Sequence, residues 1–170
     1  HRVSGIKLFM GSSTGNMLVD RMNSLRNIFN GTDLLIATHC ESQDIIKKNT
    51  EFYLEECGIE NDADKDLPLS YHPKIRSVEA SYESSKLAND LAADTEAHLH
   101  ILNLSSAREL ELLQNDIPLS VKQITAEICD PHVIFPSDDY RTLDTRVKCS
   151  PAVKKPEDRE ALRRAINNNT

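Results

Sequence analysis

The chain has 170 residues, of which 39% are hydrophobic and 28% charged, and its formal net charge is −7. This length and composition suit one folded domain with an apolar core. The acidic balance argues against a nucleic-acid partner, which would need a basic face, and no apolar run approaches the roughly 18 residues of a membrane-spanning helix.

The first predicted element is a short apolar strand over residues 6–10, which breaks into a loop at Gly11. A helical pattern follows over residues 17–28, where apolar side chains recur at helical spacing. The strand contains one cation, Lys7. Burying an ammonium between helices costs several kcal/mol unless the charge is paired or neutralised. The sequence therefore predicts a group that compensates Lys7.

The second predicted strand, residues 33–40, is a nearly continuous apolar run that includes His39 near its end. Such runs are typical of parallel sheets that are covered on both faces. Ser42 is a candidate N-cap for the helix that follows, and residues 58–71 predict a polar surface excursion. A helix is predicted over residues 77–93, and we interpret His72 and Arg76 before it as structural.

Two further strands are predicted, over residues 97–104 and 121–129. Between them Ser106 predicts the start of a helix through residue 113, with Glu109 as its capping-box partner. The last predicted elements are a loop over residues 130–132, an extended piece over residues 145–151 and a helix over residues 156–166.

Four strands that alternate with helices indicate a parallel α/β fold. In such folds the active residues lie at the carboxyl ends of the strands. His39, Asn103 and residues 129–132 all occupy such ends, whereas Lys7 lies within its strand. These residues are therefore the candidates for a functional site.

Several segments, in order and at natural spacing, resemble a dihydroorotase of the Bacteroidetes type: GIKLFMGSSTGNMLVD, IATHCE, HPKIRS, LHIL, ITAEIC and EDREALRRA. The resemblance implies a member of the amidohydrolase superfamily, whose fold is a (β/α)8 TIM barrel that holds one or two zinc ions. It also implies the interconversion of carbamoyl aspartate and dihydroorotate in pyrimidine biosynthesis.

The family carries a carboxylated lysine on its fourth strand and a histidine ligand on its fifth, and these correspond to Lys7 and His39. Carbon dioxide would turn the amine of Lys7 into a carbamate, an anion that bridges two metals. This reaction would remove the positive charge of Lys7 that the strand otherwise has to compensate. Residues 1–170 then form a partial amidohydrolase barrel domain with about strands four to seven. We expect the family's HxH pair before His1 and its general-base aspartate beyond Thr170, so that no catalytic residue lies within this chain.

The chain departs from the family pattern at three positions. Asn103 stands where the family has a histidine ligand, and an amide oxygen is a poorer zinc ligand than imidazole. Ser150 stands in place of a substrate-binding asparagine, and His132 is the remaining member of a histidine pair with a weak expected contact to substrate. These changes suggest a decayed or repurposed site.

Two alternatives to a dihydroorotase stay open: a catalytically inactive scaffold of the same fold, and another cyclic amidase such as a hydantoinase or allantoinase. A scaffold would bind partners, and the resemblance suggests a homo-oligomer or association with a pyrimidine-pathway transcarbamoylase. The four cysteines form no CxxC pair, which argues against a zinc ribbon and a disulfide framework. Unpaired thiols indicate a reducing compartment, so a cytoplasmic protein is expected.

Overall fold

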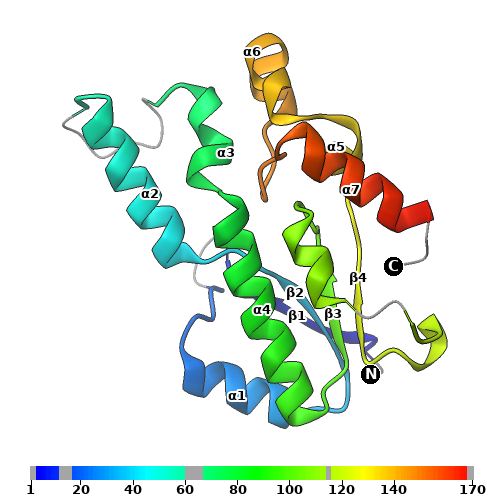
Figure 1. The fold of residues 1–170 in the computed structure, drawn as a ribbon. Coiled ribbons are helices and arrows are strands. Elements are labelled where there is room, and N and C mark those ends of the chain that lie inside the picture. Colours follow the sequence, from blue (N-terminus) through cyan, green and yellow to red (C-terminus); the bar gives the residue numbers. More distant parts are fainter. Residues whose placement is uncertain (1–2, 12–16, 60–66, 114–115, 168–170) are drawn as a thin grey trace.

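The computed structural model describes residues 3–11, 17–59, 67–113 and 116–167. Four parallel strands form one sheet in the order β1 (Gly5–Phe9), β2 (Leu35–His39), β3 (Leu99–Leu102) and β4 (Ile124–Ala126). Because neighbours in the sheet are also neighbours in the chain, each connection crosses back over the same sheet (Figure 1). The sequence prediction of a parallel α/β fold is confirmed.

The helices that connect and follow the strands have these bounds: α1 (Met22–Asn30), α2 (Gln43–Glu56), α3 (His72–Ile75), α4 (Val78–Thr95), α5 (Asp130–Ile134), α6 (Tyr140–Leu143) and α7 (Pro156–Asn167). The predicted cap of α2 is confirmed, since the Ser42 side chain accepts a hydrogen bond from the amide of Ile45. Short 3₁₀ turns lie over Leu69–Tyr71, Arg108–Leu112, Leu119–Val121, Ser137–Asp139 and Asp144–Val147. No helix in these parts of the chain is both long and apolar enough to cross a membrane.

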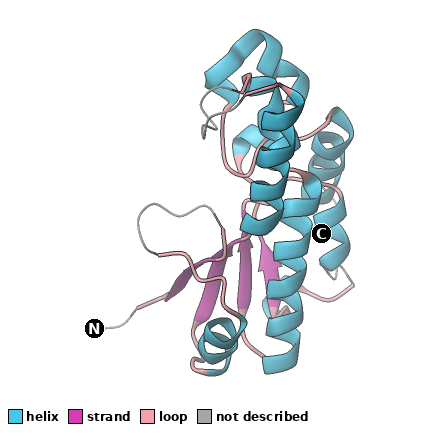
Figure 2. Cartoon of the chain, turned by 90° about the vertical axis from the view of Figure 1, so that its left-hand side faces the viewer, coloured by secondary structure: helices cyan, strands magenta, loops and turns pink. Residues whose placement is uncertain are grey.

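The two faces of the sheet differ in composition, as the strand register requires. Leu8, Ile36 and Ile101 lie on one face and are buried in the main core against Leu25 of α1 and Leu91 of α4. The opposite face carries a polar row in which Lys7, Ala37, His100 and Thr125 are successive cross-strand partners. Figure 2 shows the strands side by side and pointing toward the end where most helices gather, so their carboxyl ends lie near those helices.

Two predicted helices differ from the observed ones. The first begins at Met22 and not at residue 17, because Leu18 instead forms a bridge with Phe9 and extends the edge of the sheet. The helix expected over residues 106–113 is a 3₁₀ turn at Arg108–Leu112, because Glu109 turns into the core. The hydrogen bonds of Glu109 with the preceding serines, described below, hold this tighter turn.

Three further boundaries also need correction. Residues 130–132 begin α5, since Asp130 and Pro131 both suit the first turn of a helix. Residues 145–151 are not extended throughout, because a 3₁₀ turn buries Val147 in a small cluster with Tyr140. The strand predicted over residues 121–129 pairs with β3 only over Ile124–Ala126.

A close backbone approach joins the ends of β1 and β2. A Cβ atom on Gly11 would lie 2.3 Å from the carbonyl oxygen of Glu41 and 2.7 Å from its amide nitrogen. Only glycine fits this approach without a shift of the backbone. Gly11 thus allows the chain to pass close to the backbone of Glu41 at the carboxyl end of the sheet, where the candidate site residues lie.

Candidate functional site

His39 is the last residue of β2 and is buried, with 6% of its surface exposed. Its Nε2 atom lies 3.0 Å from Oε2 of Glu41, and its Nδ1 atom lies 3.3 Å from Nδ2 of Asn103. A carboxylate accepts but does not donate, and an amide nitrogen donates but does not accept. With these partners, a neutral His39 ring carries its proton on Nε2 and accepts from the Asn103 amide at Nδ1.

Glu41 is fully buried, although sequence reasoning assigned it no role. Burial by itself raises the pKa of its carboxyl, but the hydrogen bond from His39 and the charge of Arg76 outweigh it, so the pKa stays below its usual value. Nη1 of Arg76 donates to Oε2 of Glu41 over 2.6 Å. Arg76, which the sequence suggested was only structural, is thus paired with the carboxylate that binds His39. The sequence signal that could have pointed to Glu41 is that it is a charged residue directly after an apolar strand.

Lys154 is a second buried charge that sequence reasoning missed. Its ammonium donates to the carbonyl oxygens of Arg76 and Ala152, over 2.6 Å and 3.0 Å. Burial lowers the pKa of Lys154 to about 8, against the opposing charges of Glu109 and Glu41. The signal was again local, since Lys154 follows the apolar pair at residues 152–153.

The lowered pKa of Lys154 predicts a pH dependence of stability. Between about pH 8 and pH 10.5 the unfolded chain keeps this proton while the folded chain releases it, so this group makes stability rise with pH in that window. Lys154→Met should remove the rise. We expect the difference in unfolding free energy between wild type and variant to change by roughly 3 kcal/mol across the window. Urea denaturation at several pH values measures it.

The matched control for this prediction is Lys155→Met, because Lys155 is exposed and adjacent in the chain. Its unfolding free energy should follow that of the wild type at every pH. Parallel curves for wild type and Lys154→Met would contradict the assignment of a lowered pKa to Lys154.

Asn103 follows β3 in the left-handed region, with φ of 61°, a conformation that asparagine tolerates. Its side-chain amide lies between two partners: Nδ2 donates to His39, and Oδ1 accepts from Sγ of Cys129 over 2.8 Å. Burial, followed by the charges of Glu127 and Asp130, raises the pKa of the Cys129 thiol, which therefore stays protonated and donates. Asn103 is thus beside His39, as the prediction of a shared site requires.

Lys7 lies on the same face of the sheet as His39, because its partner Ala37 is two residues before His39 on β2. The Lys7 side chain is exposed, and its Nζ atom lies 5.1 Å from the centre of the Phe9 ring. The premise that Lys7 is buried between helices is therefore wrong for this structure. β1 is the first strand in the order of this sheet, and among the described strands it pairs only with β2.

Ser150 and His132 meet at the same turn. Ser150 is exposed, precedes a cis peptide bond to Pro151 and lines a cavity of about 120 Å³ together with His72 and Arg76. His132 is buried, and its Nε2 atom lies 2.9 Å from the carbonyl oxygen of Pro151. Burial lowers the pKa of His132, so the ring is held neutral while it donates to this turn. A contact of either residue with substrate stays a prediction.

The fit to a metal ion is partial. Nowhere in residues 3–11, 17–59, 67–113 and 116–167 do three or more His, Cys, Asp and Glu side chains form a group able to hold a metal. The donors that fit are Nδ1 of His39 and, on the same face, the amine of Lys7 once it is converted to a carbamate. Two donors from one half of a barrel would need ligands from other strands to complete a zinc site.

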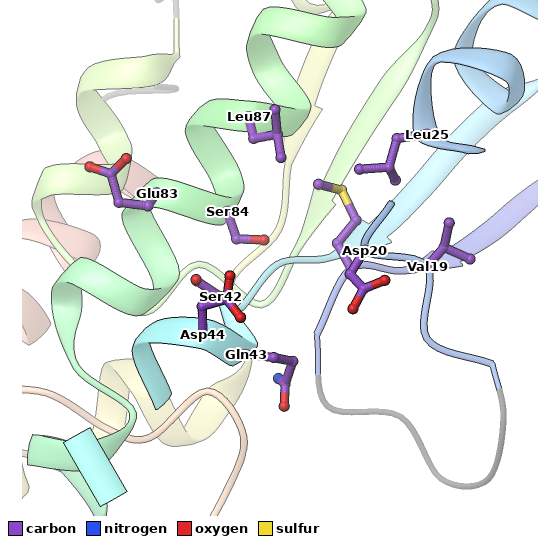
Figure 3. Close-up of a pocket in the computed structure, with 10 residues that line it drawn as sticks. Val19, Asp20, Leu25, Ser42, Gln43, Asp44, Glu83, Ser84 and Leu87 are labelled. Carbon is purple, nitrogen blue, oxygen red and sulfur yellow. The ribbon is translucent and has the colours of Figure 1, made fainter. Parts of the chain in front are cut away.

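A larger cavity, of about 410 Å³, lies on the helical side of the sheet (Figure 3). Its carboxylates come from three segments: Asp20 before α1, Asp44 on α2 and Glu83 on α4. None of the predicted site residues lines it. We therefore assign the candidate site to the carboxyl ends of β2 and β3 and not to this cavity.

Comparison with known proteins found no matching family model. Among curated proteins, an allantoinase of Arabidopsis thaliana is 28% identical over 96% of this chain and 33% of its own length. A dihydroorotase of Bacillus subtilis is 25% identical over 90% of this chain and 32% of its own length. The chain thus spans about a third of the length of these relatives.

Solved structures give the same result at the level of the fold. The dihydropyrimidinase of Brevibacillus agri matches 98% of this chain with a TM-score of 0.78 and 21% identity, over 35% of its own length. A D-hydantoinase of Thermus sp. matches 96% of this chain and 35% of its own, with a TM-score of 0.77 and 16% identity. Together with the relatives, these matches indicate the amidohydrolase superfamily and confirm the prediction of part of a TIM barrel.

Proposed function

We propose that this chain is part of a zinc-dependent hydrolase of cyclic amides and that its reaction is the interconversion of carbamoyl aspartate and dihydroorotate. The observation that carries the proposal is the environment of His39. A buried histidine at the carboxyl end of a barrel strand donates Nε2–H to a carboxylate, so its Nδ1 is the unprotonated nitrogen, which accepts from the Asn103 amide. Relatives that are dihydroorotases and allantoinases support the same class of reaction.

In this proposal His39 and the carbamate of Lys7 hold the metal, and zinc supplies a polarised amide carbonyl and an activated hydroxide when bound. Glu41 fixes the ring of His39 through Nε2. Asn103 occupies the space beside Nδ1, and its amide is the group that a metal would have to displace or accept as a weak ligand. Ser150 and His132 line the turn where substrate would be contacted.

A second candidate is a catalytically inactive scaffold, and the geometry of Asn103 favours it. The amide oxygen of Asn103 is taken by the thiol of Cys129 and its nitrogen by His39, so this side chain is satisfied without a metal. Such a scaffold would form a homo-oligomer or bind a pyrimidine-pathway transcarbamoylase. The Arabidopsis relative keeps a third reaction open, the opening of a cyclic ureide such as allantoin. A cytoplasmic location belongs to the proposal, in keeping with the free thiols of all four cysteines.

The test uses the intact protein that contains this chain. Its zinc content is measured, and hydrolysis of dihydroorotate, allantoin and hydantoin is assayed side by side. His39→Asn should lower zinc affinity and activity by more than the about 10- to 100-fold cost of losing an outer-shell partner. His98→Asn is the matched control, because His98 is exposed before β3.

The outcomes separate the candidates. Hydrolysis of dihydroorotate that depends on zinc and on His39 supports the proposed reaction. Zinc binding with activity only on allantoin or hydantoin would identify the protein as a hydrolase of that compound instead. A protein that binds no zinc and hydrolyses none of these compounds is the inactive scaffold.

A further inference from the structure

A buried carboxylate, Glu41, lies at the centre of the charged groups around the candidate site. It is 0% exposed, and the backbone of Gly11 lies close against its own backbone. Its Oε2 atom accepts from both His39 and Arg76, while Oε1 has no hydrogen-bond partner among the described residues. A fully buried carboxylate that is held by two hydrogen bonds has little room to move, so it constrains the geometry of its partners.

A second layer of contacts holds Arg76 in place. Lys154 donates to the carbonyl oxygen of Arg76 over 2.6 Å and to that of Ala152 over 3.0 Å. Arg76 in turn donates to Glu41 over 2.6 Å. The segment before α4 and the segment before α7 are therefore both tied to the carboxylate that accepts the hydrogen bond from His39.

We propose that Glu41 is a positioning residue: it holds His39 in the tautomer with Nε2 protonated and with an unprotonated Nδ1 that faces Asn103. Only one ring nitrogen of a neutral imidazole carries a proton. Because Glu41 presents only acceptors, it draws that proton to Nε2, over 3.0 Å. The amide nitrogen of Asn103, 3.3 Å from Nδ1, needs the same tautomer. Glu41 and Asn103 thus both require that Nδ1 is the unprotonated nitrogen of the ring.

The inference rests on the proposed function only for the identity of the group that Nδ1 binds. A competing role for Glu41 is purely structural, as the partner of Arg76 in a buried ion pair. That role makes no demand on the proton of His39. The tautomer of His39 and the affinity for zinc therefore distinguish the two roles, whereas a loss of stability would not.

The first measurement is the tautomer of His39 in the metal-free intact protein, read from the ¹⁵N shifts of labelled histidine and assigned with His39→Asn. We expect protonated Nε2 and unprotonated Nδ1. The opposite tautomer in the wild type would overturn the proposal without any variant of Glu41, so the test does not depend on whether a variant folds.

The second measurement compares Glu41→Gln with Glu79→Gln in zinc competition titrations. Glu79 pairs with Arg108 at the surface, so the control removes the same charge from another arginine ion pair. The amide in Glu41→Gln can donate as well as accept, so we expect a mixture of tautomers and zinc affinity about 10- to 100-fold weaker. A single unchanged tautomer, or zinc affinity equal to that of the control, would overturn the proposal. If the wild type binds no zinc, the proposed function fails, and the tautomer alone decides the role of Glu41.

Discussion

Replacing Glu109 with alanine is expected to destabilise the protein by about 3–5 kcal/mol, because several buried donors lose a shared anionic acceptor. Glu109 is 2% exposed. It accepts from the hydroxyls of Ser85, Ser105 and Ser106 over 2.9 Å, 3.2 Å and 2.8 Å, and from the amide of Ser105 over 3.1 Å. These bonds join α4 to the loop that follows β3, so their loss loosens the support of the sheet.

Urea denaturation of purified variants measures this effect. Glu111→Ala is the matched control, because Glu111 lies in the same 3₁₀ turn with its side chain exposed, and its stability should stay close to that of the wild type. Glu109→Gln keeps the size of the side chain and one acceptor oxygen. Its free energy of unfolding should lie between those of Glu109→Ala and Glu111→Ala. A loss below about 1 kcal/mol for Glu109→Ala would mean that the serines find other partners.

The second large effect is expected from Asn103→His in the intact protein, which should raise its affinity for zinc at least about tenfold. Imidazole is a better zinc ligand than an amide oxygen. The position tolerates the change, because histidine, like asparagine, is enriched among non-glycine residues with positive φ, and Asn103 has φ of 61°. The new ring would stand beside Nδ1 of His39, where the amide nitrogen now lies at 3.3 Å.

Zinc titration and hydrolysis of dihydroorotate check this prediction. Asn103→Ala is the control, since it clears the same space without adding a ligand. A gain of zinc and of activity in Asn103→His alone would identify a decayed enzyme. No gain over the control would leave the scaffold as the better interpretation.

Local pattern predicted the existence of the four strands and the cap at Ser42, but it was wrong about the helix expected to start at Ser106. The strands β1 and β2 followed from runs of apolar residues, because such runs indicate burial. The cap at Ser42 followed from a hydrogen bond to an amide only three residues away. The parallel sheet followed from the alternation of strands and helices. His39 and Asn103 were placed at strand ends correctly, and they lie side by side.

The charged groups around His39 could not be predicted in this way. Arg76 is 35 residues from Glu41, and Lys154 is 78 residues from Arg76, so no local pattern links them. The exposure of Lys7 likewise depends on which strand forms the edge of the sheet. The sequence by itself determined the parallel α/β fold and the strand ends that carry the candidate site. Only the tertiary structure decided which buried charges meet there, because that depends on how distant segments pack to satisfy each other's desolvated groups.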